Sequence, residues 1–300
     1  MNYDLVVIGG GAAGISGAIS AYDAGLKNIL IIDREDNMGG VLNELIESGY
    51  GYMENGLTGV EVAENLKKEI LKRDIDVKLN TLVLDVYKDK TIKIVSGTEG
   101  VKEINAKSII FATGAREKPR GQLNISYSSS AGIMSVASSR KLIVNDGYLP
   151  GKEVIIYGLD VNSIYLSKML VIEGAKNITI VEPSKESKNK SNYLDDILGY
   201  ENIKILYNTK ITQIIQNGRI VGVKIKDNNS NEKILDCDSL ILSVGLDSSK
   251  RLFKKFRRNR AENGLFVVGN AEKIRYDLEF IVSQGKEAGI MAKDYIASLN

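Results

Sequence analysis

The sequence has no histidine and no tryptophan, and only one cysteine and three prolines among 300 residues. With the single cysteine Cys237, the chain has no CxxC redox pair and forms no disulfide within itself. The lack of histidine excludes metal sites built on imidazole. A general base would have to be a carboxylate, a lysine, a tyrosine, water or a cofactor. We expect no metal site, and the sequence names no catalytic residue.

A strong excess of one charge is also missing. The net charge of +2 gives no general attraction to nucleic acid or to acidic lipid. No apolar run approaches the roughly 18 residues of a membrane-spanning helix, and the segment Met1 to Asp4 lacks the basic start of a signal peptide. We therefore expect a cytoplasmic protein that binds neither nucleic acid nor membrane.

The length and the apolar content of 43% indicate two globular domains. Two segments have the order strand, glycine-rich turn, helix and strand, which predicts parallel sheets with right-handed crossovers. They begin at residue 5 and, after Pro150-Gly151, at residue 153. We expect an α/β fold in which residues 1–115 and 245–300 form one Rossmann-like domain. Residues 116–244 form a second Rossmann-like domain inserted into the first.

Hydrophobic patterning places the individual elements. Expected strands cover residues 5–8, 28–32, 77–86, 91–95, 108–112, 153–157, 177–181, 203–207, 219–226, 239–244 and 265–268. Expected helices cover residues 12–25, 56–73 and 161–173, and a last helix directly follows residue 270 and ends near residue 297.

The first glycine-rich turn carries the clearest functional signal. Gly9, Gly11 and Gly14 form G-x-G-x-x-G directly after a buried strand and before a helix. Such glycines give a tight turn, close approach of backbone N–H groups to a pyrophosphate, and close helix packing. Asp33 follows Gly14 by nineteen residues, at the end of the next strand, where a carboxylate can accept hydrogen bonds from ribose. The pattern predicts a dinucleotide site.

Three further features favour FAD over NAD as the dinucleotide. Met38-Gly39-Gly40 lets the backbone approach the ribityl-phosphate side, and the turn 111–115 ends a strand with small residues. The segment 264–270 places the polar side chain of Asn270 after a strand, before a helix whose N-terminus would face the flavin pyrimidine edge. The order of the three features supports the interpretation more than any one of them does.

The chain resembles two-domain FAD-dependent pyridine nucleotide-disulfide oxidoreductases of the thioredoxin reductase type. Within that group it is most similar to the flavoprotein subunits of hydrogen cyanide synthase and of opine or proline dehydrogenases, and to a flavoprotein accompanying glycerol-3-phosphate dehydrogenase. The segments that carry the resemblance are VVIGGGAAG, GGVLNELIESGYGY, LTGVE, IIFATGAREKPRG, AGI, GYLPGKEVIIYG and GLFVVGN. They span almost the whole chain.

The resemblance implies a division of labour among the residues. Asp33 would hold the adenosine ribose, Val83 would touch adenine through its backbone, and Gly269-Asn270 would meet the ribityl chain. The residues expected to bind FAD are Gly9, Gly11, Ala12, Ala13, Gly14, Asp33, Arg34, Gly39, Gly40, Val41, Val83, Ala112, Thr113, Gly114, Gly269 and Asn270.

The second glycine turn departs from this family. Of the nicotinamide-binding fingerprint only Gly158 remains, with Asp160 and Ser163 at the other two glycine positions. A carboxylate there would repel a pyrophosphate. No basic pair follows Glu182 to take a 2′-phosphate. We expect a degenerate NAD(P)H site, and a degenerate but tolerant site remains the alternative. Leu45 and Glu47 stand where similar proteins carry cysteine and histidine.

Residues 250–260 hold seven basic residues in eleven, with apolar residues between them. One interpretation is a solvated amphipathic helix that packs its apolar side, and the other is a basic patch that docks an acidic partner. Cys237 precedes a buried strand, so we expect it to be structural.

The sequence thus favours an FAD-dependent oxidoreductase with a flavin-mediated redox step. Two alternatives remain open: an electron-transfer or scaffold subunit of a larger dehydrogenase, and a non-catalytic nucleotide sensor. The expected partner is a small-molecule substrate or a reduced protein electron carrier. For assembly, a partner dehydrogenase subunit and a homodimer both remain open.

Overall fold

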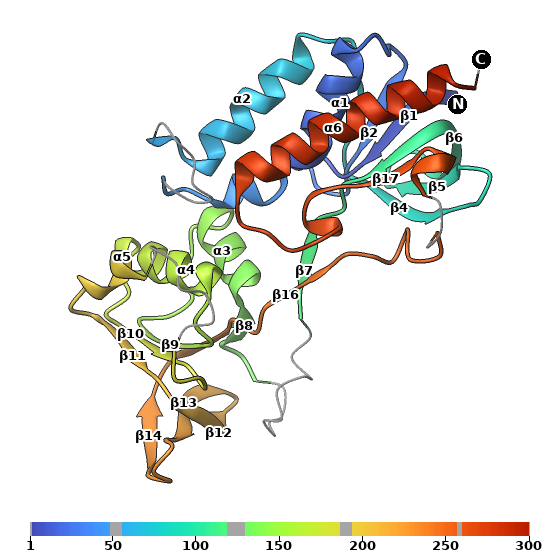
Figure 1. Ribbon diagram of the computed structural model, residues 1–300. Helices are drawn as coiled ribbons and strands as arrows, with labels where there is room; N and C mark the ends of the chain where they lie inside the picture. Colours follow the sequence, from blue (N-terminus) through green and yellow to red (C-terminus); the bar gives the residue numbers. More distant parts are fainter. Residues whose placement is uncertain (1, 49–55, 119–129, 187–193, 257–259, 300) are drawn as a thin grey trace. The chain divides into compact units, whose positions relative to one another are not determined.

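The computed structural model describes residues 2–48, 56–118, 130–186, 194–256 and 260–299 (Figure 1). The chain divides into two compact units. Unit 1 consists of residues 1–116 and 247–300, and unit 2 of residues 117–246. The observed architecture confirms the predicted α/β class, because each unit contains a parallel sheet that is covered by helices.

Unit 1 is built on one mixed sheet. Its strand order is β3 (Asp76–Lys78), β2 (Ile29–Ile32), β1 (Asn2–Ile8), β6 (Gly100–Phe111), β5 (Thr91–Ser96) and β4 (Thr81–Val86), and β17 (Leu265–Val267) also pairs with β6. The strands β3, β2, β1, β6 and β17 are parallel, whereas β4 and β5 are antiparallel. All four residues of β2 are buried, as expected for a parallel strand covered on both faces.

The helices of unit 1 are α1 (Ala12–Asp23), α2 (Gly59–Leu71) and α6 (Leu278–Ala297). Single turns of 3₁₀-helix occur at η1 (Gly40–Glu44), η5 (Ala261–Asn263) and η6 (Gly269–Ala271). Thr58 begins α2 with a capping box, in which Thr58 and Glu61 satisfy each other's backbone N–H groups. This cap fixes the start of α2 beside η1.

Helices α1 and α6 run side by side (Figure 1). Their contact depends on glycine, because a Cβ atom at Gly285 would lie 2.2 Å from the Ala13 carbonyl oxygen. A Cβ atom at Gly289 would lie 2.3 Å from the Gly17 carbonyl oxygen. The backbones of the two helices are therefore in direct contact, and α6 holds α1 against the sheet.

Unit 2 has a five-stranded parallel sheet and a separate three-stranded antiparallel sheet. The parallel order is β11 (Ile203–Leu206), β10 (Asn177–Val181), β9 (Glu153–Tyr157), β15 (Ser239–Leu242) and β8 (Ile133–Ser135). The antiparallel sheet contains β12 (Lys210–Asn217), β13 (Arg219–Lys226) and β14 (Glu232–Asp236). The helices are α3 (Val136–Val144), α4 (Val161–Ile172) and α5 (Asp195–Leu198), and the strands β7 (Ala115–Glu117) and β16 (Leu246–Ser248) pair where the chain passes between units.

Several predicted elements need correction. The strand expected over 77–86 is two strands, because Asn80 has a positive φ of 49° and turns the chain between β3 and β4. The strand expected at 108–112 begins at Gly100. Its first half was missed because it is largely exposed and carries polar residues. The last helix begins at Leu278 rather than directly after Asn270. The elements β7, β8, α3, α5, β12, β14 and β16 were not predicted.

We predict that Gly285→Ala destabilises the protein by about 1–3 kcal/mol or more, because the added methyl group must push apart two backbones that already touch. Urea unfolding followed by circular dichroism measures the effect. Gly97→Ala is the matched control, because a Cβ atom at Gly97 would meet no atom within 4 Å. Equal stability of the two variants would contradict the close packing of α1 and α6.

Candidate functional site

The first glycine turn lies at the end of β1, where Gly9 has a φ of 113°. A Cβ atom at Gly9 would lie 2.2 Å from the Ala112 carbonyl oxygen, and one at Gly14 would lie 1.9 Å from the Gly9 carbonyl oxygen. These two glycines are required by the packing of the turn. Gly11 differs, since a Cβ atom there would meet nothing within 4 Å. The middle glycine of the fingerprint therefore faces open space.

Gly11 is also the residue that precedes the first turn of α1. No side chain caps this end of the helix, and its first turn has no acidic residue. The first helical hydrogen bond runs from the Ile15 amide to the Gly11 carbonyl, at 2.9 Å. The N–H groups of Ala12, Ala13 and Gly14 lie ahead of it and have no partner within the helix. Such an end, with its positive dipole, suits an anion.

Asp33 lies at the end of β2, as predicted. Its carboxylate accepts hydrogen bonds from the Gly10 amide at 2.6 Å and from the Glu35 amide at 3.0 Å. Each carboxylate oxygen retains acceptor capacity beyond these bonds. Arg34 beside it has a side chain that is 72% exposed and pairs with Glu35 at 3.3 Å. Asp33 is therefore held by the glycine turn itself, whereas Arg34 points to solvent.

The second glycine pair meets the first turn directly. The Gly39 amide donates to the Gly10 carbonyl at 2.7 Å, and Gly39 also forms a parallel bridge with Gly11. Gly39 and Gly40 both have positive φ, and a Cβ atom at Gly40 would lie 3.3 Å from the Gly11 Cα atom. Val41, in η1, is 44% exposed. Segments 9–11 and 39–40 thus form one backbone surface at the start of α1.

The turn after β6 borders the same region. The Ala112 amide donates to the Ile8 carbonyl at 2.8 Å, at the end of β1. Ser249 accepts a hydrogen bond from the Thr113 hydroxyl at 2.9 Å and donates its amide to the Gly114 carbonyl at 3.0 Å. A Cβ atom at Gly114 would meet nothing within 4 Å. Residues 112–114 therefore lie beside the glycine turn and leave space next to it.

Gly269 lies at the start of η6, against α1. Its φ is 61°, and a Cβ atom there would lie 3.0 Å from the Ala13 Cβ atom. The Asn270 side chain accepts the Arg275 amide at 2.8 Å and so shapes the loop before α6. Gly269 therefore adjoins the first turn of α1, and Asn270 has a structural partner.

The structure adds a contact at Val83 that the sequence did not indicate. Val83 is 5% exposed, and its carbonyl oxygen accepts a hydrogen bond from the Arg251 guanidinium at 3.1 Å. The same guanidinium donates to the Leu84 carbonyl at 2.8 Å. Arg251 is distant in sequence and its role depends on backbone acceptors, so no local pattern predicts it.

The glycine turn of unit 2 has the same backbone plan. Gly158 has a φ of 103°, and a Cβ atom there would lie 2.1 Å from the Ser243 carbonyl oxygen. Glu182 accepts the Leu159 amide at 2.7 Å and the Ser184 amide at 2.8 Å. Glu182 therefore occupies the place that Asp33 occupies in unit 1.

The start of α4 differs from the start of α1 in one respect. Asp160 caps the helix, and its carboxylate accepts the Ser163 amide at 3.0 Å and the Ser243 hydroxyl at 2.8 Å. The Asp160 amide donates to the Ser163 hydroxyl at 2.9 Å. Burial raises the pKa of the Asp160 carboxyl, and these hydrogen bonds oppose the rise. A side chain of the protein thus holds the helix end that a phosphate would approach.

The basic segment is not a helix in its described part. Residues 251–255 form turns, so the expected amphipathic helix is wrong there. Phe253 is 4% exposed, and its ring centroid lies 5.4 Å from that of Phe111. Lys255 pairs with Asp85 at 2.7 Å. The apolar residues anchor the segment to unit 1, while Arg257, Arg258 and Asn259 lie outside the described residues.

Cys237 is buried in the core of unit 2, at 5% exposure. Burial, with smaller contributions from Asp238 and Asp236, raises the pKa of its thiol to about 12. This burial matches the structural role predicted from the sequence. Leu45 is likewise buried, against Gly59.

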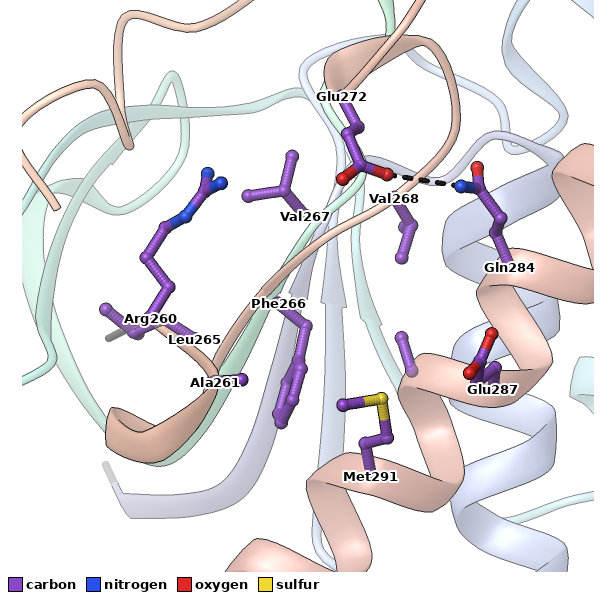
Figure 2. Close-up of a pocket in the computed structure, with 11 residues that line it drawn as sticks. Arg260, Ala261, Leu265, Phe266, Val267, Val268, Glu272, Gln284, Glu287 and Met291 are labelled. Carbon is purple, nitrogen blue, oxygen red and sulfur yellow. Dashed lines mark hydrogen bonds between the residues drawn. The ribbon is translucent and has the colours of Figure 1, made fainter. Parts of the chain in front are cut away.

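A separate cavity of about 440 Å³ lies between β17 and α6 (Figure 2). Phe266 and Met291 line it, and the Gln284 amide donates to the Glu272 carboxylate at 3.1 Å across one end. No predicted cofactor residue lines this cavity. Because Gln284 also accepts the Gly269 amide at 3.2 Å, the cavity adjoins the site without forming part of it.

The chain belongs to the pyridine nucleotide-disulphide oxidoreductase family, which matches residues 3–273. It is 23% identical over 310 residues to a 34.2 kDa protein in the rubredoxin operon of Clostridium pasteurianum, covering 98% of this chain and 97% of that protein. It is 28% identical over 315 residues to a subunit of alkyl hydroperoxide reductase from Staphylococcus aureus (strain NCTC 8325 / PS 47). That match covers 98% of this chain but 59% of the relative.

Solved structures share the fold. Thioredoxin reductase of Lactococcus lactis has a TM-score of 0.80 at 19% identity, with 99% of each chain covered. That of T. acidophilum has the same TM-score at 22% identity, covering 100% of this chain and 99% of the other. L-proline dehydrogenase of P. horikoshii has a TM-score of 0.68 at 18% identity, covering 100% of this chain and 55% of the other.

The described residues were also compared with the requirements of a metal site and of a membrane-spanning helix. These residues contain no group of three or more histidine, cysteine, aspartate or glutamate side chains placed to hold a metal ion. None of the helices in the described ranges combines the length and apolarity needed to cross a membrane.

Proposed function

We propose that this protein is an FAD-dependent oxidoreductase in which unit 1 binds FAD and unit 2 has lost the nicotinamide site. The carrying observation is the contrast between two equivalent helix ends. The start of α1 is open at Gly11, whereas the start of α4 is capped by Asp160.

The residues of unit 1 fit the parts of FAD. The amides of Ala12, Ala13 and Gly14 would bind the pyrophosphate, and Asp33 would accept the ribose hydroxyls. Bound FAD supplies one- and two-electron redox chemistry, while the protein binds and orients it. The open Cβ positions of Gly11 and Gly114 indicate room for such a ligand beside the backbone.

The adenine and ribityl contacts extend the proposal. Val83 would meet adenine through its backbone, and its carbonyl can accept a second hydrogen bond besides that of Arg251 because a carbonyl has two lone pairs. The backbone of Gly269 and the amide of Asn270 would meet the ribityl chain. Asn270 would keep its Nδ2 group for this contact while Oδ1 holds the Arg275 amide.

The functional type that we propose is the flavoprotein of the hydrogen cyanide synthase or of opine and proline dehydrogenases. In support, L-proline dehydrogenase of P. horikoshii shares the fold of this chain over 55% of its own length. The single cysteine leaves no intramolecular dithiol for thioredoxin-type chemistry. Two interpretations compete with this one: an electron-transfer or scaffold subunit of such a dehydrogenase, and a nucleotide sensor. If the protein copurifies with a partner subunit and shows no activity without it, the subunit interpretation is favoured.

We predict that the purified protein is yellow and releases intact FAD on denaturation. Gly11→Asp should abolish FAD retention, because it gives α1 the carboxylate cap that α4 already has in Asp160. Absorbance and chromatography of the released flavin measure this, with Gly97→Ala as the control. If folded wild-type protein binds no flavin from excess FAD, the proposed function is wrong.

We also predict that NADH and NADPH are poor reductants of the bound flavin. A pyrophosphate at α4 would have to displace the half-buried, hydrogen-bonded cap of Asp160, at a cost of about 2–3 kcal/mol or more. Because each 1.4 kcal/mol is about tenfold in affinity, an ordinary micromolar site would move toward millimolar. Anaerobic stopped-flow mixing tests this, and rapid flavin bleaching at micromolar nicotinamide would contradict it.

Electrons would then come from an organic substrate or from a reduced protein carrier. The carrier is favoured by the basic segment 250–260. It directly follows Ser249, which is hydrogen-bonded to Thr113 and Gly114 at the proposed FAD site. The relative from a rubredoxin operon supports the same interpretation. A basic surface beside the proposed FAD site suits an acidic protein partner.

For the carrier, we predict that replacing Lys250 and Lys254 by glutamine leaves flavin content and melting temperature nearly unchanged, because exposed charges contribute little to stability. Electron exchange with a reduced acidic carrier should slow and lose part of its salt dependence. Lys210→Gln on unit 2 is the control. Equal rates of electron exchange at low salt in the wild type, in the variant with both lysines replaced and in the control would contradict docking on the basic segment.

A further inference from the structure

Lys67, on α2, is a buried lysine that the proposed FAD contacts do not use. It is 9% exposed, and lysine is rarely buried without a specific partner. Its ammonium group donates to the Glu64 carboxylate at 2.7 Å and to the Asn43 side-chain oxygen at 3.4 Å. Glu64 is exposed, so the ammonium lies between an exposed carboxylate and the inner face of η1.

Asn43 connects Lys67 to the glycine turns. The Asn43 amide nitrogen donates to the Met38 carbonyl at 2.9 Å, directly before Gly39. The Gly39 amide then donates to the Gly10 carbonyl at 2.7 Å. A continuous path of hydrogen bonds and backbone thus leads from the ammonium of Lys67 to the turn at the start of α1.

The path is tightly packed. A Cβ atom at Gly39 would lie 2.7 Å from the Asn43 side-chain oxygen and 2.8 Å from the Ala63 Cβ atom on α2. The position of Gly39 therefore depends on Asn43, and the orientation of Asn43 depends on its donors and acceptors. With both of its polar atoms bonded, the Asn43 amide is held in one orientation.

We propose that Lys67 is a positioning residue for the pyrophosphate of FAD. It holds Asn43, and through Asn43 the Gly39-Gly40 backbone, in the conformation that closes on the glycine turn. The inference rests on the proposed function, because it needs FAD in unit 1. If Lys67 only tied α2 to η1, its loss would lower stability and leave FAD affinity unchanged.

The test compares Lys67→Gln with Lys68→Gln, an exposed neighbour on the same helix. Flavin is removed, and FAD is titrated back while quenching of its fluorescence is followed at two salt concentrations. We expect Lys67→Gln to raise the Kd about tenfold at both salt concentrations, as for loss of one hydrogen bond to a charged group. Lys68→Gln should bind as the wild type does.

A second variant keeps the test decisive if Lys67→Gln does not fold. Asn43→Ala breaks the same path and should also weaken FAD binding, and the double variant should lose less than the sum of the two losses. The proposal is overturned if Lys67→Gln, or Asn43→Ala in its place, binds FAD as tightly as Lys68→Gln. It is also overturned if the apo-protein melting temperature falls while the Kd stays the same. Failure of the wild type to bind FAD would instead refute the proposed function.

Discussion

The site depends on the contact between the start of α1 and the end of β1. Gly14 packs on the Gly9 carbonyl, and Gly9 packs on the Ala112 carbonyl, so three backbone segments meet with no side chain between them. Helix α6 presses on the other side of α1 through Gly285. Because α1 is fixed in this way, the free N–H groups of its first turn converge on the space at the start of the helix. The anion-binding surface is therefore preformed in the absence of a ligand.

Units 1 and 2 show how one backbone plan can give two surfaces. Both units have a positive-φ glycine after a strand and an acidic residue that accepts two backbone amides, namely Asp33 or Glu182. The units differ at the residue that precedes the helix. In unit 2, the Asp160 carboxylate accepts hydrogen bonds from the Ser163 amide and the Ser243 hydroxyl. Under the proposed function, this cap would take the place of a nucleotide phosphate at the start of α4.

The sequence was informative wherever structure is local. Fully buried strands such as β2 and the spacing of Gly9, Gly11 and Gly14 are visible as patterns, and they led to the fold class and the position of the glycine turn. The exposed first half of β6 has no apolar pattern and was missed. One interpretation of the basic segment was an amphipathic helix that packs its apolar side. Residues 251–255 form turns instead, whereas Phe253 does pack, in a long-range contact with Phe111. Arg251 and Lys67 act through distant backbone or side-chain partners, which no short motif records.

The division of unit 1 between two stretches of chain bears on how the protein is made. Strand β17 and helix α6 belong to unit 1 but follow unit 2 in the sequence. During synthesis, unit 2 is complete while α1 still lacks the helix that covers it, so the apolar face of α1 stays exposed until residues 278–297 emerge. The middle of the chain can therefore fold first, and the N-terminal residues wait longest for their partners. Chaperone binding during translation would therefore be concentrated on the N-terminal segment that contains α1.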